Sequence, residues 1–171
     1  IDEEYKVWND KIVKIYLPRE NEDGLVPQDD KYLSLIDITQ PDCTLSEMSK
    51  EAHRLAGEYG YQKTQMSKQA DVMLLMYLFE DLFTPEVKVK NFYFYEKRCL
   101  HDSSLSLSTY CALAADLEEK ETAYKLFNRA SAIDMGDCMW SSHEGIHAAS
   151  LGGIWQCCVL GFMGLRRYGE E

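Results

Sequence analysis

The 171 residues are 46% hydrophobic and 12% aromatic, enough for one sizeable core and too apolar for a disordered chain. The formal net charge of −11 argues against nucleic-acid binding, because an acidic surface repels a phosphate backbone. The longest apolar stretch, residues 148–165, is broken by four glycines, so we expect no membrane-spanning segment.

Helices dominate the predicted structure. Apolar residues recur three and four apart in several segments, and none alternates long enough to indicate a strand. Helices are predicted at residues 2–16, 44–62, 68–83, 84–98, 104–117, 119–134 and from 145 or 146 to 165. We therefore expect an all-α chain forming a single helical domain over residues 1–171, with consecutive helices packed antiparallel.

Local signals support several of these boundaries. Pro18 ends the first helix, and the proline-rich residues 17–43 predict a long loop. Loops of this length are usually functional or packed over the rim of a site. Thr44 with Glu47 is a capping box, and Thr84 precedes a proline at the first helical position. From Val72 onwards the third helix is apolar nearly all round, which predicts burial on most sides.

The six cysteines form no C-x-x-C metal motif. Cys157 and Cys158 are adjacent within an apolar helical run, where each acts as a small hydrophobic residue. We interpret the cysteines as reduced thiols of a cytoplasmic protein. The cysteines are Cys43, Cys99, Cys111, Cys138, Cys157 and Cys158.

The stretch from His143 to His147 reads H-E-x-x-H, the pattern of zinc metalloproteases. A catalytic zinc needs a third protein ligand, and the position where a common extension of the pattern has histidine is Gly153. His53 and His101 stand far away in the sequence, with no spacing that favours a shared metal. The pattern therefore predicts no metal site.

Three segments carry a resemblance to a known family. These segments are, in order, KQADVMLLMYLFEDLF, NFYFYEKRCLHDSSLSLS and EGIHAASLGGIWQCCVLGFMGLR. Through them the chain resembles glycoside hydrolase family 65 over residues 68–167. This family contains maltose, kojibiose, nigerose and trehalose phosphorylases and some α-glucoside hydrolases. The resemblance implies part of an (α/α)6 barrel, ending before the family's C-terminal β domain.

The resemblance also implies an activity and its ligands. It suggests a phosphorylase that converts an α-linked glucosyl disaccharide, with inversion, to β-glucose 1-phosphate. Inorganic phosphate is then a co-substrate and no other cofactor is needed. The family's glucosyl-binding pair corresponds to Lys68 and Gln69. The residues that the resemblance assigns to phosphate are Ser103, Ser104 and His147, with His101 and Ser150 nearby.

Several alternatives stay open. The family's general acid glutamate falls upstream of Ile1, so we expect these residues to be a fragment that is inactive alone. A hydrolase of the same family and a non-catalytic helical interaction module remain as other hypotheses. The resemblance does not fix the disaccharide linkage, and homodimer formation by the intact enzyme is left open. His143 does not match the family pattern and is interpreted as incidental.

Overall fold

The computed structural model describes residues 2–39, 50, 54–55, 57–101, 103–135 and 145–165. This part of the chain is helical, and its only β pairing consists of two isolated parallel bridges. Its α-helices are α1 (Asp2–Lys14), α3 (Asp71–Leu78), α4 (Pro85–Glu96), α5 (Ser106–Asp116), α6 (Lys120–Ser131) and α7 (Ala148–Gln156). No helix in the described ranges is long and apolar enough to cross a membrane.

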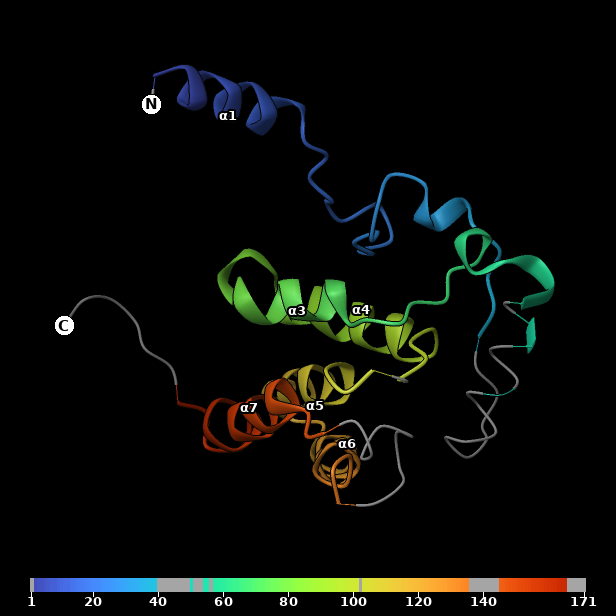
Figure 1. Cartoon of the computed structure of the whole chain (residues 1–171), viewed down its shortest axis with the longest axis vertical. Helices are drawn as coiled ribbons and strands as arrows, with labels where there is room; N and C mark the ends of the chain where they lie inside the picture. The colour runs from blue at the N-terminus through green and yellow to red at the C-terminus, as the bar shows by residue number, and fades with distance from the viewer. Residues whose placement is uncertain are drawn as a thin grey trace.

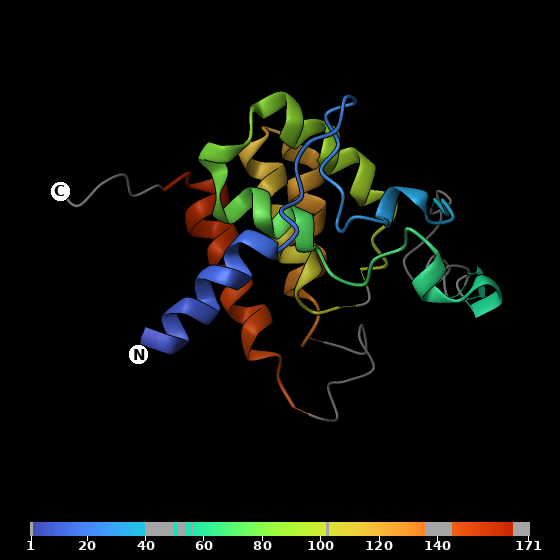
Figure 2. The ribbon, with the colours of Figure 1, turned by 90° about the horizontal axis from the view of Figure 1, so that it is seen from above.

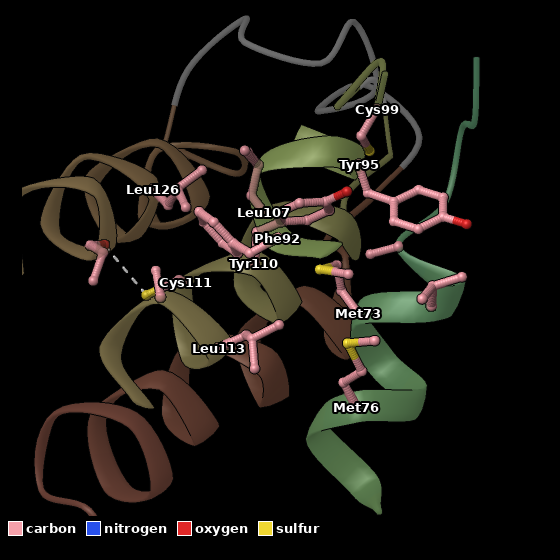
Figure 3. Close-up of a cluster of buried hydrophobic side chains, with 14 of the residues drawn as sticks. Met73, Met76, Phe92, Tyr95, Cys99, Leu107, Tyr110, Cys111, Leu113 and Leu126 are labelled. Atoms are coloured by element: carbon pink, nitrogen blue, oxygen red, sulfur yellow. Dashed lines mark hydrogen bonds between the residues drawn. The ribbon is translucent and has the colours of Figure 1, made fainter. Parts of the chain in front are cut away.

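Helix α5 is the centre of the packed part of the chain. It contacts α3, α4, α6 and α7, and most of its residues are buried (Figure 1, Figure 2). Tyr110 and Leu113 of α5 meet Phe92 of α4 and Met73 and Met76 of α3 in one hydrophobic cluster (Figure 3). The central position of α5 follows from its composition, because small and apolar residues allow close approach from several sides.

Two predicted helix boundaries are confirmed. Thr84 is the N-cap of α4, where its side chain accepts a hydrogen bond of 3.4 Å from the Val87 amide, and Pro85 follows at the first position. Helices α5 and α6, which were predicted to end at residue 117 and begin at residue 119, are joined by a tight turn in which Glu118 has a φ of +61°. The capping box of Thr44 and Glu47 lies outside the described residues.

The third helix is shorter and more exposed than predicted. It ends at Leu78, and a separate 3-10 turn covers Glu80–Leu82. Only Val72, Met73 and Met76 of α3 are buried, whereas Leu78 and Leu82 are 61% and 72% exposed. The prediction of burial on most sides is therefore wrong for this chain by itself, because no described segment covers the outer face of α3.

Helix α1 also presents apolar residues without a partner. None of its residues is buried, and Figure 1 shows it apart from α3 to α7. Trp8 is 58% and Ile12 65% exposed. An amphipathic helix gains most of its stability from packing its apolar face, so α1 obtains little from the described chain.

The long loop is held against α4 by hydrogen bonds, several of which involve Asn91. Asn91 is fully buried and accepts a 2.8 Å hydrogen bond from the Val26 amide. Its side-chain nitrogen donates to the carbonyls of Gly24 at 2.9 Å and Val87 at 2.8 Å. The described part of the loop, residues 17–39, is thus an ordered segment packed on the helices.

The last helix continues beyond α7 as a π-helical turn, Cys157–Phe162. This turn packs on α5 through Gly161, which lies against Ala112 and Ala115. None of the described cysteines, Cys99, Cys111, Cys157 and Cys158, is in a disulfide. Cys43 and Cys138 lie outside the described residues.

Candidate active site

The N-terminal ends of three helices face the same way. Early in α5, Ser108 lies against Gly153, and its carbonyl accepts a 3.2 Å hydrogen bond from the Cys157 thiol. Later in α5, Ala112 and Ala115 lie against Gly161. Helices α5 and α7 therefore run in the same direction. Figure 3 shows that α3 does too, because Met73 lies near Tyr110 and Met76 lies further along, towards the level of Leu113. The starts of α3, α5 and α7 share one end of the bundle.

The predicted glucosyl-binding pair stands just before α3. Lys68 is exposed and Gln69 is partly exposed, so both can reach a ligand. The preceding residue, Ser67, is bridged to the segment after α4. Its amide donates to the Arg98 carbonyl and its carbonyl accepts from the Leu100 amide, both at 2.9 Å. This bridge brings the approach to α3 beside the approach to α5.

The loop that enters α5 contains two of the predicted phosphate ligands. Ser103 is mostly buried, and its hydroxyl accepts a 3.3 Å hydrogen bond from the Leu105 amide. Its carbonyl accepts a 3.2 Å bond from the Ser106 hydroxyl. Ser104 is only partly buried. These bonds fix the loop, and Ser104 remains the more accessible hydroxyl.

His101 is a buried, neutral imidazole. Its side chain packs edge-on against Tyr110 with ring centroids 4.8 Å apart, and Nδ1 lies 3.3 Å from the Ser106 hydroxyl. Burial, with a smaller contribution from the Arg129 charge, lowers the pKa of His101 to about 3. Its φ of +51° lies in the left-handed region, which few residues other than glycine adopt. This environment suits a residue that shapes the loop more than one that binds an anion by its own charge.

His147 forms the N-cap position of α7 and is held by a carboxylate that follows α6. Its backbone amide donates to Asp134 Oδ2 at 2.9 Å, and its Nδ1 lies 2.6 Å from Asp134 Oδ1. A carboxylate can only accept here, so Nδ1 carries the proton. The hydrogen bond from His147 is the main reason why the pKa of Asp134 is lowered. Both bonds together fix the orientation of the imidazole ring.

Ser150 lies in the first turn of α7. It is almost fully buried, and its hydroxyl has no hydrogen-bond partner within the described ranges. The structure thus gathers the predicted residues at one end of the bundle, with Lys68 and Gln69 at the start of α3, the serines and His101 at α5, and His147 and Ser150 at α7. His143 lies outside the described residues, and no cluster of metal-ligating side chains occurs among those that are described.

The comparison with known families decides which group these helices represent. The glycosyl hydrolase family 65 central catalytic domain matches residues 1–156. The chain belongs to this family. The resemblance seen in its three motifs is confirmed, and the described helices are part of an all-α (α/α)6 barrel.

Known family 65 proteins support the same assignment. The chain is 38% identical over 96% of its length to a kojibiose phosphorylase of Halothermothrix orenii, and 35% identical over 98% to a maltose phosphorylase of Bacillus subtilis. It spans about a fifth of their lengths, 21% and 22%. A solved structure assigned as a kojibiose phosphorylase, from the human microbiome, is similar over 88% of this chain and 21% of its own, with a TM-score of 0.72 and 27% identity.

Two charged residues of this family 65 chain escaped sequence reasoning. Asp134 stands thirteen residues before His147, a separation that matches no local motif. Arg129 lies in the last turn of α6 and is mostly buried, which lowers its pKa. Its Nε and Nη2 have no hydrogen-bond partner in the described part of the chain. Asp134 is the last residue of the helix predicted at 119–134 and Arg129 lies five residues earlier, and neither belongs to a recognisable motif, so the sequence gave no reason to single them out.

Proposed function

We propose that this chain forms part of the active site of a glycoside phosphorylase that acts on an α-linked glucosyl disaccharide. The supporting observation is that residues from three separate motifs meet at the N-terminal ends of α3, α5 and α7. In a non-catalytic helical module there is no reason for these motifs to converge. The relatives named as kojibiose and maltose phosphorylases agree with the proposal.

Lys68 and Gln69 are proposed to bind the glucosyl unit. An ammonium group offers three donors, and an amide offers both donors and an acceptor, so the pair can hold several sugar hydroxyls together. Both side chains are accessible, and the segment that carries them is fixed by the Ser67 bridge. A fixed backbone is what orientation of a sugar ring requires, because a small misplacement of a substrate is costly in rate.

The proposed phosphate site lies beside this pair, at the starts of α5 and α7. Neither helix has a side-chain cap, so first-turn amides remain as possible donors to an anion. Ser103, Ser104 and Ser150 add hydroxyls, and His101 supports the loop. His147 is proposed as the charged ligand. Because Asp134 takes Nδ1, the contact to phosphate falls to Nε2, which donates only when the ring is protonated.

The proposed reaction is an inverting phosphorolysis. A carboxylic acid protonates the glycosidic oxygen while phosphate attacks the anomeric carbon from the opposite face, giving β-glucose 1-phosphate. The general acid is proposed to be a glutamate outside these residues, so the chain by itself is expected to be inactive. Phosphate serves as co-substrate, and no other cofactor is required.

The test uses the intact protein that carries this chain. It is incubated with kojibiose, maltose and trehalose, with and without inorganic phosphate, and the products are followed by proton and phosphorus NMR. The expected result is phosphate-dependent formation of β-glucose 1-phosphate from one of these disaccharides. Release of free glucose at a rate independent of phosphate would instead indicate a hydrolase of the same family. No turnover of any α-glucoside would favour a non-catalytic module.

A further inference from the structure

The Arg98 side chain connects three segments that are distant in the sequence. Its Nε donates to Gln65 Oε1 at 3.0 Å, its Nη1 to the Phe94 carbonyl at 2.7 Å and its Nη2 to Asp37 Oδ2 at 2.6 Å. The guanidinium also lies 3.8 Å from the centre of the Phe94 ring. The side chain is only 8% exposed, so these bonds are largely shielded from water.

The backbone at Arg98 joins the same segments. The Arg98 carbonyl accepts from the Ser67 amide, and the Leu100 amide donates to the Ser67 carbonyl, both at 2.9 Å. The chain then continues directly into Lys68 on one side and into His101 on the other. The two proposed binding segments therefore leave from a single short β bridge.

The long loop joins this bridge from the other side. The Ile36 carbonyl accepts a 2.9 Å hydrogen bond from the Gln65 amide, and the Tyr32 hydroxyl donates to the Gln65 carbonyl at 2.5 Å. The Gln65 side chain donates in turn to the carbonyls of Leu33 and Leu35, at 3.3 and 3.4 Å. The Gln65 side chain thus donates to the loop through Nε2 and accepts from Arg98 through Oε1.

We infer that Arg98 is a positioning residue for the sugar site, which rests on the function proposed above. Through Gln65 it fixes the segment that ends in Lys68 and Gln69, and through Asp37 it fixes the long loop relative to the same segment. The phosphate loop depends on Arg98 less, because Ser103 and His101 have hydrogen bonds of their own to the start of α5. Arg98 therefore acts mainly on binding of the disaccharide.

The role requires the shape of arginine. Its planar group presents donors in several fixed directions, and three of them are used here by three different acceptors. A lysine keeps the charge but cannot reach Gln65, Asp37 and the Phe94 carbonyl from one flexible ammonium. A methionine of similar length keeps part of the packing and loses every hydrogen bond. These two substitutions separate charge from geometry.

The experiment compares Arg98→Met, Arg98→Lys and Asp37→Asn in the intact protein, with Arg19→Met, an exposed arginine of the same loop, as the matched control. For Arg98→Met we expect the KM for disaccharide to rise about tenfold, the effect of losing one charged hydrogen bond, and the KM for phosphate to stay within about twofold. Arg98→Lys should recover part of this loss. Asp37 is 52% exposed, so Asp37→Asn should raise the disaccharide KM by at most about fivefold.

Hydrogen exchange of the same proteins, read by mass spectrometry, gives a readout independent of activity. Peptides that contain the Ser67 and Leu100 amides should exchange faster in Arg98→Met and unchanged in Arg19→Met. A lower thermal midpoint with unchanged disaccharide KM and unchanged exchange would overturn the positioning role. If the unmodified protein shows no phosphorolysis, the proposed function fails, and the exchange rates still decide whether Arg98 holds the two segments together.

Discussion

The contact between α5 and α7 allows one stability prediction to be worked out in detail. A methyl group on Gly153 would lie 2.7 Å from the Ser108 Cβ and still closer to the Ser108 hydroxyl oxygen. The hydroxyl can rotate away, but the Cβ is fixed to the backbone. Substitution of Gly153 by alanine therefore has to separate the two helices where they lie closest.

The magnitude follows from two opposing effects. Overpacking of a tight contact costs about 1–3 kcal/mol, while replacing a helical glycine by alanine gains about 1 kcal/mol. Gly152 supplies the control, because it is the adjacent helical glycine and a Cβ there would meet nothing within 4 Å. The gain in helix propensity is the same in both variants. Their difference in unfolding free energy should therefore be about 1–3 kcal/mol, the cost of overpacking.

The assay is denaturant unfolding of the intact protein, with both variants followed under identical conditions. Gly152→Ala should match or exceed the unmodified protein in stability, and Gly153→Ala should fall below it. Adding Ser108→Gly to Gly153→Ala should reduce the loss of stability, because it removes the Cβ that the new methyl group meets. Adding Ser108→Ala should not, because alanine keeps this Cβ. Equal stability of Gly153→Ala and Gly152→Ala would refute the proposed close contact.

Other substitutions test the site and the core. His147→Ala should raise the KM for phosphate about 10- to 100-fold in steady-state kinetics, through loss of one charged hydrogen bond, while His143→Ala changes it little. Asp134→Asn should raise the same KM by a smaller factor, because the ring loses its orienting carboxylate; an unchanged KM would contradict that role. Asn91→Leu should lower unfolding free energy by at least about 1–3 kcal/mol, since buried backbone groups lose their partner. The pKa of His101 is about 3 in the folded chain, so between pH 6.5 and 3 the unfolded chain binds a proton that the folded chain does not. The unfolding free energy should therefore fall as the pH is lowered from 6.5 towards 3, by up to about 1.4 kcal/mol per pH unit. In His101→Asn, measured over the same range, it should fall less steeply.

Local chemistry in the sequence predicted helix boundaries well where a cap or turn was present. Thr84 and Pro85 begin α4 where expected, and the turn at Glu118 separates α5 from α6. The end of α3 was predicted less well, because the apolar run continues to Phe83 without a glycine or proline. Hydrophobicity showed that this segment avoids water, but it did not show that the described chain covers only one of its faces.

The residues of the candidate site remain a prediction from the sequence, whereas the residues that support them could not be predicted at all. Lys68, Gln69 and the serines belong to continuous motifs, so a family resemblance could point to them. Asp37 is 61 positions from Arg98 and Gln65 is 33 positions away, and no periodicity in the sequence relates them. Such pairs are set by how the segments cross, which only the three-dimensional structure shows.

The parallel course of α3, α5 and α7 gives a physical reason why these motifs belong together. Each helix directs the positive end of its dipole towards the same side, and in none does the side chain of the N-cap residue accept a hydrogen bond from the first turn. We propose that this concentration of donors helps to bind a phosphate dianion in a chain whose 171 residues carry a net charge of −11. In this proposal His147 adds a ring donor, which Asp134 orients. The affinity for phosphate should therefore come from many oriented dipoles together with one ring, so that no single substitution at this end of the bundle abolishes binding.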